Sequence, residues 1–197
     1  MGRHIDYFGT LNSPWTWMGH ARLMAMAGDA GATVRFHAVN YGEIFPVTGG
    51  LPLPKRAPAR QAYRMQELKR WRAHHGLPLN LEPAFFPADE TQAAHLVIAA
   101  RETGGDACGL AERFMRAVWS EERNIADPAT VRAIVQEAGM DPDELAAAAD
   151  RIDAAAIRSA DTKMAIERGV FGAPTYILDD EMFWGQDRLD FVAERLG

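Results

Sequence analysis

Three short polar segments of the chain contain residues that could do chemistry, and the first of them surrounds Ser13. Ser13 and Pro14 follow a short apolar segment and precede a stretch with helical spacing, which places Ser13 at a helix N-terminus. Free backbone N–H groups and the helix dipole favour an anion at such a position. Serine is also a common cap, so the hydroxyl could instead serve only the helix.

Two further segments near the end of the chain have the same ambiguity. They are Gly172-Ala173-Pro174-Thr175 and Trp184-Gly185-Gln186-Asp187-Arg188. In the first, a proline precedes a predicted strand, where a cis peptide bond or an ordinary loop end are both compatible with the sequence. The second is the polar start of a helix, whose side chains either cap the helix or bind a ligand. Neither segment identifies a function by itself.

Composition excludes several classes of protein. The chain of 197 residues is 48% apolar, which is globular, and its single cysteine, Cys108, rules out an internal disulfide or a dithiol redox pair. One cysteine also fits a reducing cytoplasm, and the patterned start predicts no leader segment. The net charge of −6 gives no support for nucleic-acid binding, and no apolar run is long enough for a membrane span. His74 and His75 lack a second ligand pair nearby, so no metal is expected.

The pattern of apolar residues predicts strands and helices that would position these segments. Strands are expected at 5–9 and 33–39 on either side of a helix over 15–29, and helices at 60–75, 89–103, 106–122, 128–139 and 141–168. A hairpin over 175–184 turns at Asp179-Asp180, and a helix over 186–196 closes the chain. Gly42 to Pro58 is rich in proline and glycine and is predicted to be an irregular, mobile or functional loop.

The expected architecture is therefore α/β: a strand–helix–strand unit, a block of helices, and a strand–strand–helix unit. Residues 1–45 and 169–197 would form one small α/β layer. Residues 46–168 would form an inserted loop and helical subdomain.

The three polar segments together resemble a known family. Ser13-Pro14-Trp15-Thr16-Trp17 resembles the Cys-Pro-Trp-Cys-Tyr segment of DsbA-like thioredoxin-fold proteins, with both cysteines replaced. The run from Gly169 to Thr175 resembles the cis-proline loop of that superfamily. The run from Phe183 to Leu189 resembles the last-helix entry of kappa-class glutathione transferases and 2-hydroxychromene-2-carboxylate isomerases. The resemblance covers essentially the whole chain and implies a thioredoxin-like fold with a helical insertion.

The resemblance implies that glutathione is the cofactor. In the family, the serine at the Ser13 position donates a hydrogen bond to the glutathione sulfur and favours the thiolate, so the nucleophile comes from the cofactor. The backbone of Ala173, before a cis Pro174, pairs with glutathione as an added strand. Gln186 and Asp187 match positions that hold the γ-glutamyl end, because an acidic side chain suits its ammonium. Trp184 and Gly185 belong to the same binding segment.

The resemblance also implies a small aromatic carboxylate as substrate, which calls for cations at the mouth of the site. The sequence supplies cations in and after the proline-rich loop, namely Lys55, Arg56, Arg60 and Arg64, although any one of them alone is better explained as part of a solvated helix face. The substrate half departs from the isomerases, which tend to have Lys, Asn and Asn at the positions of Pro46, Gly50 and Asp89. The glutathione half matches the family more closely than the substrate half.

The sequence thus predicts a glutathione-dependent cis-trans isomerase of the aromatic-degradation type. It would act on an aromatic 2-oxo or 2-hydroxy acid and, like its family, form a homodimer. Two alternatives remain open. One is a kappa-like glutathione transferase with another electrophile, and the other is a redox-dead thioredoxin-like binding module.

Overall fold

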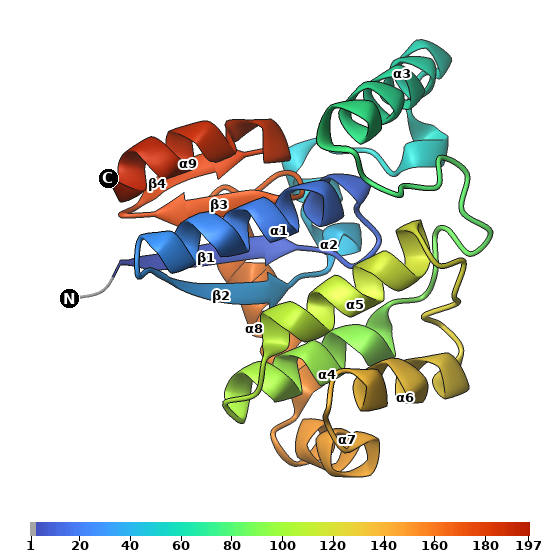
Figure 1. The fold of residues 1–197 in the computed structure, drawn as a ribbon, viewed down its shortest axis with the longest axis vertical. Coiled ribbons are helices and arrows are strands. Elements are labelled where there is room, and N and C mark those ends of the chain that lie inside the picture. Colours follow the sequence, from blue (N-terminus) through green and yellow to red (C-terminus); the bar gives the residue numbers. More distant parts are fainter. Residues whose placement is uncertain (1–2) are drawn as a thin grey trace.

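A four-stranded mixed sheet with the strand order β2-β1-β3-β4 forms the centre of the fold (Figure 1). The computed structural model describes residues 3–197. The strands are β1 (His4–Gly9), β2 (Thr33–Ala38), β3 (Thr175–Leu178) and β4 (Glu181–Trp184). β1 pairs parallel with β2, as in the predicted strand–helix–strand unit, and β3 pairs antiparallel with β4, as in the predicted hairpin; β1 and β3 pair antiparallel and join the two units. Asp179 and Asp180 have φ of 51° and 63°, the left-handed geometry of a two-residue hairpin turn.

Successive residues of each strand point to opposite faces of the sheet and bury two separate sets of side chains. Tyr7 and Tyr176 lie on the face covered by α1 (Pro14–Asp29), with ring centroids 5.1 Å apart. Phe8 and Ile177 lie on the other face, where they pack with residues of α2 (Tyr41–Thr48) and α8 (Ala154–Glu167). α9 (Leu189–Leu196) lies next to α1. Because α1 and α9 cover one face of the sheet and α2 and α8 the other, helices cover both faces (Figure 1).

Five more helices and two short 3₁₀ turns complete the fold. They are α3 (Pro58–His75), α4 (Thr91–Glu102), α5 (Ala107–Trp119), α6 (Pro128–Glu137), α7 (Pro142–Arg151), η1 (Leu53–Lys55) and η2 (Gln186–Arg188). The predicted cap Ser13 and the caps Asp106, Asp127 and Asp141 of α5, α6 and α7 each accept a hydrogen bond from a first-turn N–H. None of the described helices is long and apolar enough to cross a membrane.

The prediction of an irregular loop from Gly42 to Pro58 is wrong, because α2 and η1 lie within it. The side chain of Asn40 caps α2 by accepting from the N–H of Gly42 at 3.0 Å, and Ile44 is completely buried against the sheet. Pro46 removes one hydrogen bond inside this helix. Burial of the apolar face outweighs that loss, which local composition could not show.

The prediction of one helix over 141–168 is also wrong, because the chain turns between α7 and α8. Asp153 has φ of 52° there, and its side chain caps α8 by accepting from the N–H of Ala156 at 3.1 Å. α8 then packs on the sheet through Ala165. This contact joins residues on both sides of the predicted boundary between 168 and 169, and the division into two domains stays a prediction.

Candidate functional site

Ser13 lies at the point where the chain leaves β1 and enters α1. Its Oγ accepts a hydrogen bond from the N–H of Thr16 at 3.1 Å, and the residue is 8% exposed. Pro14 occupies the first helical position, so it uses up none of the free N–H groups of the first turn. The capping function of Ser13 is therefore present. It leaves the hydroxyl proton available to a further acceptor, since the oxygen serves the cap as acceptor only.

The peptide bond between Ala173 and Pro174 is cis, as the resemblance implied. Its neighbours are tied down: the carbonyl of Gly172 accepts from the Tyr41 hydroxyl at 2.8 Å, and the carbonyl of Pro174 accepts from the Gly185 N–H at 2.9 Å. The backbone N–H and C=O of Ala173 itself form no hydrogen bond with any described residue. A partly exposed backbone with both groups free can pair with an extended peptide.

The segment that begins η2 has one buried and one exposed polar side chain. Gln186 is 2% exposed, and its Oε1 lies 3.1 Å from Nε2 of His75 at the end of α3. Asp187 is exposed and pairs with Arg188 at 2.9 Å. Gly185 has φ of 102°, and a Cβ at this position would lie 2.4 Å from the Asp187 carboxylate, so glycine is required here.

A pocket of about 260 Å³ brings these segments together, and we call it the tryptophan pocket. Its predicted binding residues are Ala173, Trp184, Gly185, Gln186 and Asp187, and Trp15, Trp71, Glu67 and Arg188 complete the lining. Ser13 is not among the lining residues but precedes Trp15 by two positions at the start of the same helix. Apolar walls with a few polar groups are typical of small-molecule sites.

A second pocket of about 380 Å³ shares Trp15 and Glu67 with the first, and we call it the arginine pocket. The remaining lining residues are Arg56, Ala59, Arg60, Tyr63 and Arg64. Two predicted substrate residues, Arg56 and Arg60, therefore lie beside the tryptophan pocket. Lys55 is exposed at the end of η1 and does not line either pocket.

The guanidinium of Arg64 is the most enclosed cation of the arginine pocket. It lies over the rings of Phe86 and Trp119, at 5.6 and 6.0 Å from their centroids. Burial, with the charge of Arg56 nearby, lowers the pKa of Arg64 to about 10. Burial and the charge of Arg60 likewise lower the pKa of Arg56, whose Nε donates to the carbonyl of Leu51 at 2.8 Å.

The other two predicted substrate residues do not line these pockets. A Cβ at Gly50 would lie 2.3 Å from the ring of Phe45, so a larger residue there would require that ring to move. Asp89 accepts from the N–H of Thr91 at 2.9 Å, which lowers its pKa, and it faces a separate hollow beside His95. Their contact with a substrate stays a prediction.

Sequence reasoning missed the side chains that hold the loop before Ser13. Glu90 is 9% exposed and accepts hydrogen bonds from the backbone and side chain of Asn12, both at 3.0 Å, and from Thr10 at 2.5 Å. Arg158 pairs with its other oxygen at 2.9 Å. These residues are separated by about 70 or 80 positions, and no local pattern links them. His75, predicted only to end a helix, contacts Gln186 in the same unforeseen way.

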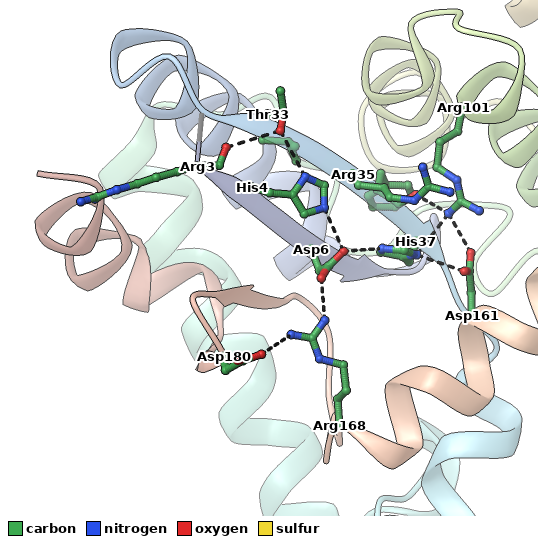
Figure 2. Close-up of polar contacts among 12 residues, drawn as sticks. Arg3, His4, Asp6, Thr33, Arg35, His37, Arg101, Asp161, Arg168 and Asp180 are labelled. Atoms are coloured by element: carbon green, nitrogen blue, oxygen red, sulfur yellow. Dashed lines mark hydrogen bonds and ion pairs between the residues drawn. The ribbon is translucent and has the colours of Figure 1, made fainter. Parts of the chain in front are cut away.

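A buried ionic network lies away from both pockets and joins β1, β2, α4 and α8 (Figure 2). Asp6 lies 2.9 Å from Nε2 of His37 and also pairs with Arg168. Asp161 lies 3.2 Å from Nδ1 of His37 and 2.7 Å from Arg101. These hydrogen bonds and charges hold the pKa values of both carboxyls below their usual range, against the opposing effect of burial. The network joins the helices to the sheet and takes no part in the candidate site.

The single cysteine of the chain, Cys108, lines neither pocket and is not suited to act as a nucleophile. Burial raises the pKa of the Cys108 thiol to about 11, so this cysteine is protonated at neutral pH. No group of three or more His, Cys, Asp or Glu side chains within 3–197 is arranged to hold a metal ion. The chemistry available is hydrogen-bond donation by Ser13, backbone pairing at Ala173, and anion binding in the arginine pocket.

Comparison with known proteins places this geometry in a family. Residues 4–197 match the model of the DsbA-like thioredoxin domain. A "2-hydroxychromene-2-carboxylate isomerase" of Pseudomonas putida is 31% identical, with 98% of this chain and 94% of that protein covered. "Glutathione S-transferase kappa 1" of Homo sapiens is 23% identical over 99% of this chain and 91% of its own.

A solved structure shows the same relation in three dimensions. The structure of a selenomethionine-labelled "2-hydroxychromene-2-carboxylate isomerase" has a TM-score of 0.81 and 27% identity, covering 98% of this chain and 94% of that one. The cis Pro174, the serine at the start of α1 and the residues of η2 are the features that the sequence resemblance rested on. The chain therefore belongs to the DsbA-like thioredoxin family, in the group of 2-hydroxychromene-2-carboxylate isomerases and kappa-class glutathione transferases.

Proposed function

We propose that this protein is a glutathione-dependent isomerase that acts on an aromatic 2-oxo or 2-hydroxy acid. The observation that carries the proposal is the unpaired backbone of Ala173 at the wall of the tryptophan pocket. The cysteinyl unit of a tripeptide can pair with that N–H and C=O as one more strand. The name of the human kappa transferase supports glutathione as that tripeptide, and the name of the related isomerases supports an aromatic carboxylate as the substrate.

Each end of the tryptophan pocket suits one part of glutathione. The exposed carboxylate of Asp187 suits the γ-glutamyl ammonium, and Gln186, held by His75, would form the floor beneath it. Ser13 would donate its hydroxyl proton toward the sulfur, because its oxygen already accepts from Thr16. When bound, glutathione would supply a thiolate as the nucleophile for reversible addition to a conjugated substrate. Ser13 and the N-terminus of α1 lower the pKa of that thiol.

The arginine pocket would hold the substrate acid next to this position. Arg56 and Arg60 offer charge-assisted hydrogen bonds to a carboxylate, and Trp15 forms an apolar wall shared by both pockets. Lys55 and Gly50 would contact the substrate only if the segment between α2 and α3 moved, and Asp89, just before α4, only if the chain there moved toward the arginine pocket.

The variant Ser13→Ala tests the assignment of the serine. Loss of one hydrogen bond to a charged sulfur should cost about 1.5–3 kcal/mol, or roughly ten- to a hundredfold in turnover. Ultraviolet absorbance of the bound thiolate should show a higher pKa of the glutathione thiol. Ser13→Thr keeps the hydroxyl and the cap and should restore both values. Unchanged turnover in Ser13→Ala, with only the fall in melting temperature that loss of a cap produces, would show that Ser13 only caps α1.

A kappa-like transferase is the second candidate, and the substrate half of the site favours it. This chain has Gly50 and Asp89 at two positions where the isomerases tend to have asparagine. Gly50 has no side chain, and Asp89 lines a hollow other than the arginine pocket. A transferase consumes glutathione in proportion to product, whereas an isomerase conserves it. Turnover of aromatic 2-oxo acids with glutathione measured before and after therefore distinguishes the two. A binding module without activity would bind no glutathione at millimolar concentration in calorimetry.

The family resemblance also leads us to propose a homodimer in the cytoplasm. Sedimentation equilibrium measures the mass in solution directly. A mass equal to one chain over the working concentration range would contradict the dimer.

A further inference from the structure

The arginine pocket contains more positive charge than a single carboxylate can neutralise. Arg60 and Arg64 lie one turn apart on α3, and Arg56 lies close enough to both for its charge to be felt by each. All three line the same hollow of about 380 Å³. A carboxylate can accept hydrogen bonds from one or two guanidiniums, but three groups spread over a helical turn exceed its reach.

None of these three guanidiniums forms an ion pair with a carboxylate of the described chain. Glu67 is the only acidic side chain in the lining, and it pairs with Arg70 instead. Burial and the charge of Arg56 lower the pKa of Arg64, and burial and the charge of Arg60 lower the pKa of Arg56. Both effects are expected for like charges held together. A bound anion would relieve this repulsion.

Arg64 also packs against two aromatic rings without any ligand being present. Its guanidinium lies over the rings of Phe86 and Trp119, and its only polar contact within residues 3–197 is with the sulfur of Met65, at 4.0 Å. A stacked guanidinium keeps its N–H groups directed outward in the plane of the group, so less freedom is lost on binding. The rings of Trp15 and Tyr63, which line the same pocket, suit an aromatic acid.

We propose that the substrate carries two anionic groups, both held by Arg56, Arg60 and Arg64. This inference rests on the function proposed above and narrows its substrate class from aromatic acids in general to aromatic acids with two anionic groups. One anionic group would bind toward the enclosed Arg64, and the other toward Arg56 and Arg60 nearer the solvent.

Glutathione conjugates with a variable aryl charge test this inference, because the tripeptide stays the same. We would measure the affinities of S-benzylglutathione, S-(carboxybenzyl)glutathione and S-(dicarboxybenzyl)glutathione by calorimetry. Each added carboxylate should tighten binding by about tenfold, the effect of a charge-assisted hydrogen bond. In Arg64→Met the gain in affinity from the second carboxylate should disappear. Arg60→Met, at an exposed position where a substitution is easily tolerated, should lose the same gain. Arg72→Met, exposed on the same helix but outside this pocket, is the matched control and should retain both gains.

The outcomes separate this inference from the proposed function. Equal affinity of the mono- and dicarboxybenzyl conjugates would overturn the dianion while leaving glutathione binding intact. If no conjugate binds, the glutathione function fails, and thermal stabilisation by isophthalate and benzoate then decides the inference. Isophthalate stabilising the protein more than benzoate does, with the difference lost in Arg64→Met, would still support a dianion site. Equal stabilisation by the two would overturn it.

Discussion

His20, in α1, is a histidine buried without a hydrogen-bond partner, and we predict that it makes the fold sensitive to mild acid. The residue is 1% exposed and packs near the rings of Tyr7 and Phe36, at centroid distances of 5.7 and 6.4 Å. Neither ring nitrogen has a partner in the described part of the chain. Burial lowers the pKa of His20 from 6.5 to about 4, and the opposing effects of Cys108 and Asp106 are smaller.

The sign and size of the effect follow from this difference in pKa. Between the two values the unfolded chain binds a proton that the folded chain does not, so stability rises with pH. The contribution is fully present at neutral pH and is lost as the pH falls through this window. The full loss is about 3 kcal/mol, of which about 2 kcal/mol has occurred by about pH 5.

Urea unfolding followed by tryptophan fluorescence, at several pH values from about 4.5 to about 7.5, measures this loss. The variant His20→Leu removes the titrating group and both unsatisfied nitrogens. It should lose the acid-dependent fall and be at least as stable as the parent at neutral pH. His74→Leu is the control, because His74 is exposed on α3. Parallel curves of stability against pH for the parent and His20→Leu would refute the reasoning.

Three further predictions concern the candidate site and its support. Asp187→Asn should weaken glutathione binding roughly tenfold in calorimetry without moving the melting temperature, because the charge but not the shape is lost. Asp190→Asn on α9 is the control. Equal affinity of Asp187→Asn and the parent for glutathione would place the γ-glutamyl site elsewhere. His75→Phe should keep the packing but leave buried Gln186 unpaired, weakening glutathione binding about tenfold; affinity equal to the parent would mean that Gln186 needs no support. Glu90→Gln should cost about 3 kcal/mol in urea unfolding, and a loss below about 1 kcal/mol would show that the loop before Ser13 is held by other contacts.

The features that the sequence predicted correctly depend on local rules. Ser13 as a cap and Asp179-Asp180 as a hairpin turn follow from residues a few positions apart. The resemblance supplied the cis Pro174, which sequence spacing alone left open between two conformations. These features also place most of the tryptophan pocket, since its lining comes from the ends of the elements that such rules define.

The features that it missed depend on contacts between distant parts of the chain. The helical conformation of Tyr41–Thr48 depends on burying Ile44 against the sheet, which composition rich in proline cannot reveal. The bond between Glu90 and Asn12 joins residues 78 positions apart. The pairing state of an arginine is equally non-local. From the sequence, a run of cations indicates a solvated helix face. The structure shows instead that Arg64 is enclosed and has no acidic partner among the described residues.

α3 links the two pockets of the site. Leu68 is its only fully buried residue, so the core holds this helix of 18 residues weakly. Arg60 and Arg64 on α3 line the arginine pocket, and His75 at its end holds Gln186 in the tryptophan pocket. A ligand in either pocket therefore stabilises the same position of α3. If glutathione and the substrate acid bind as proposed, linkage requires that each raises the affinity for the other by the same factor, which calorimetry of one in the presence of the other would measure.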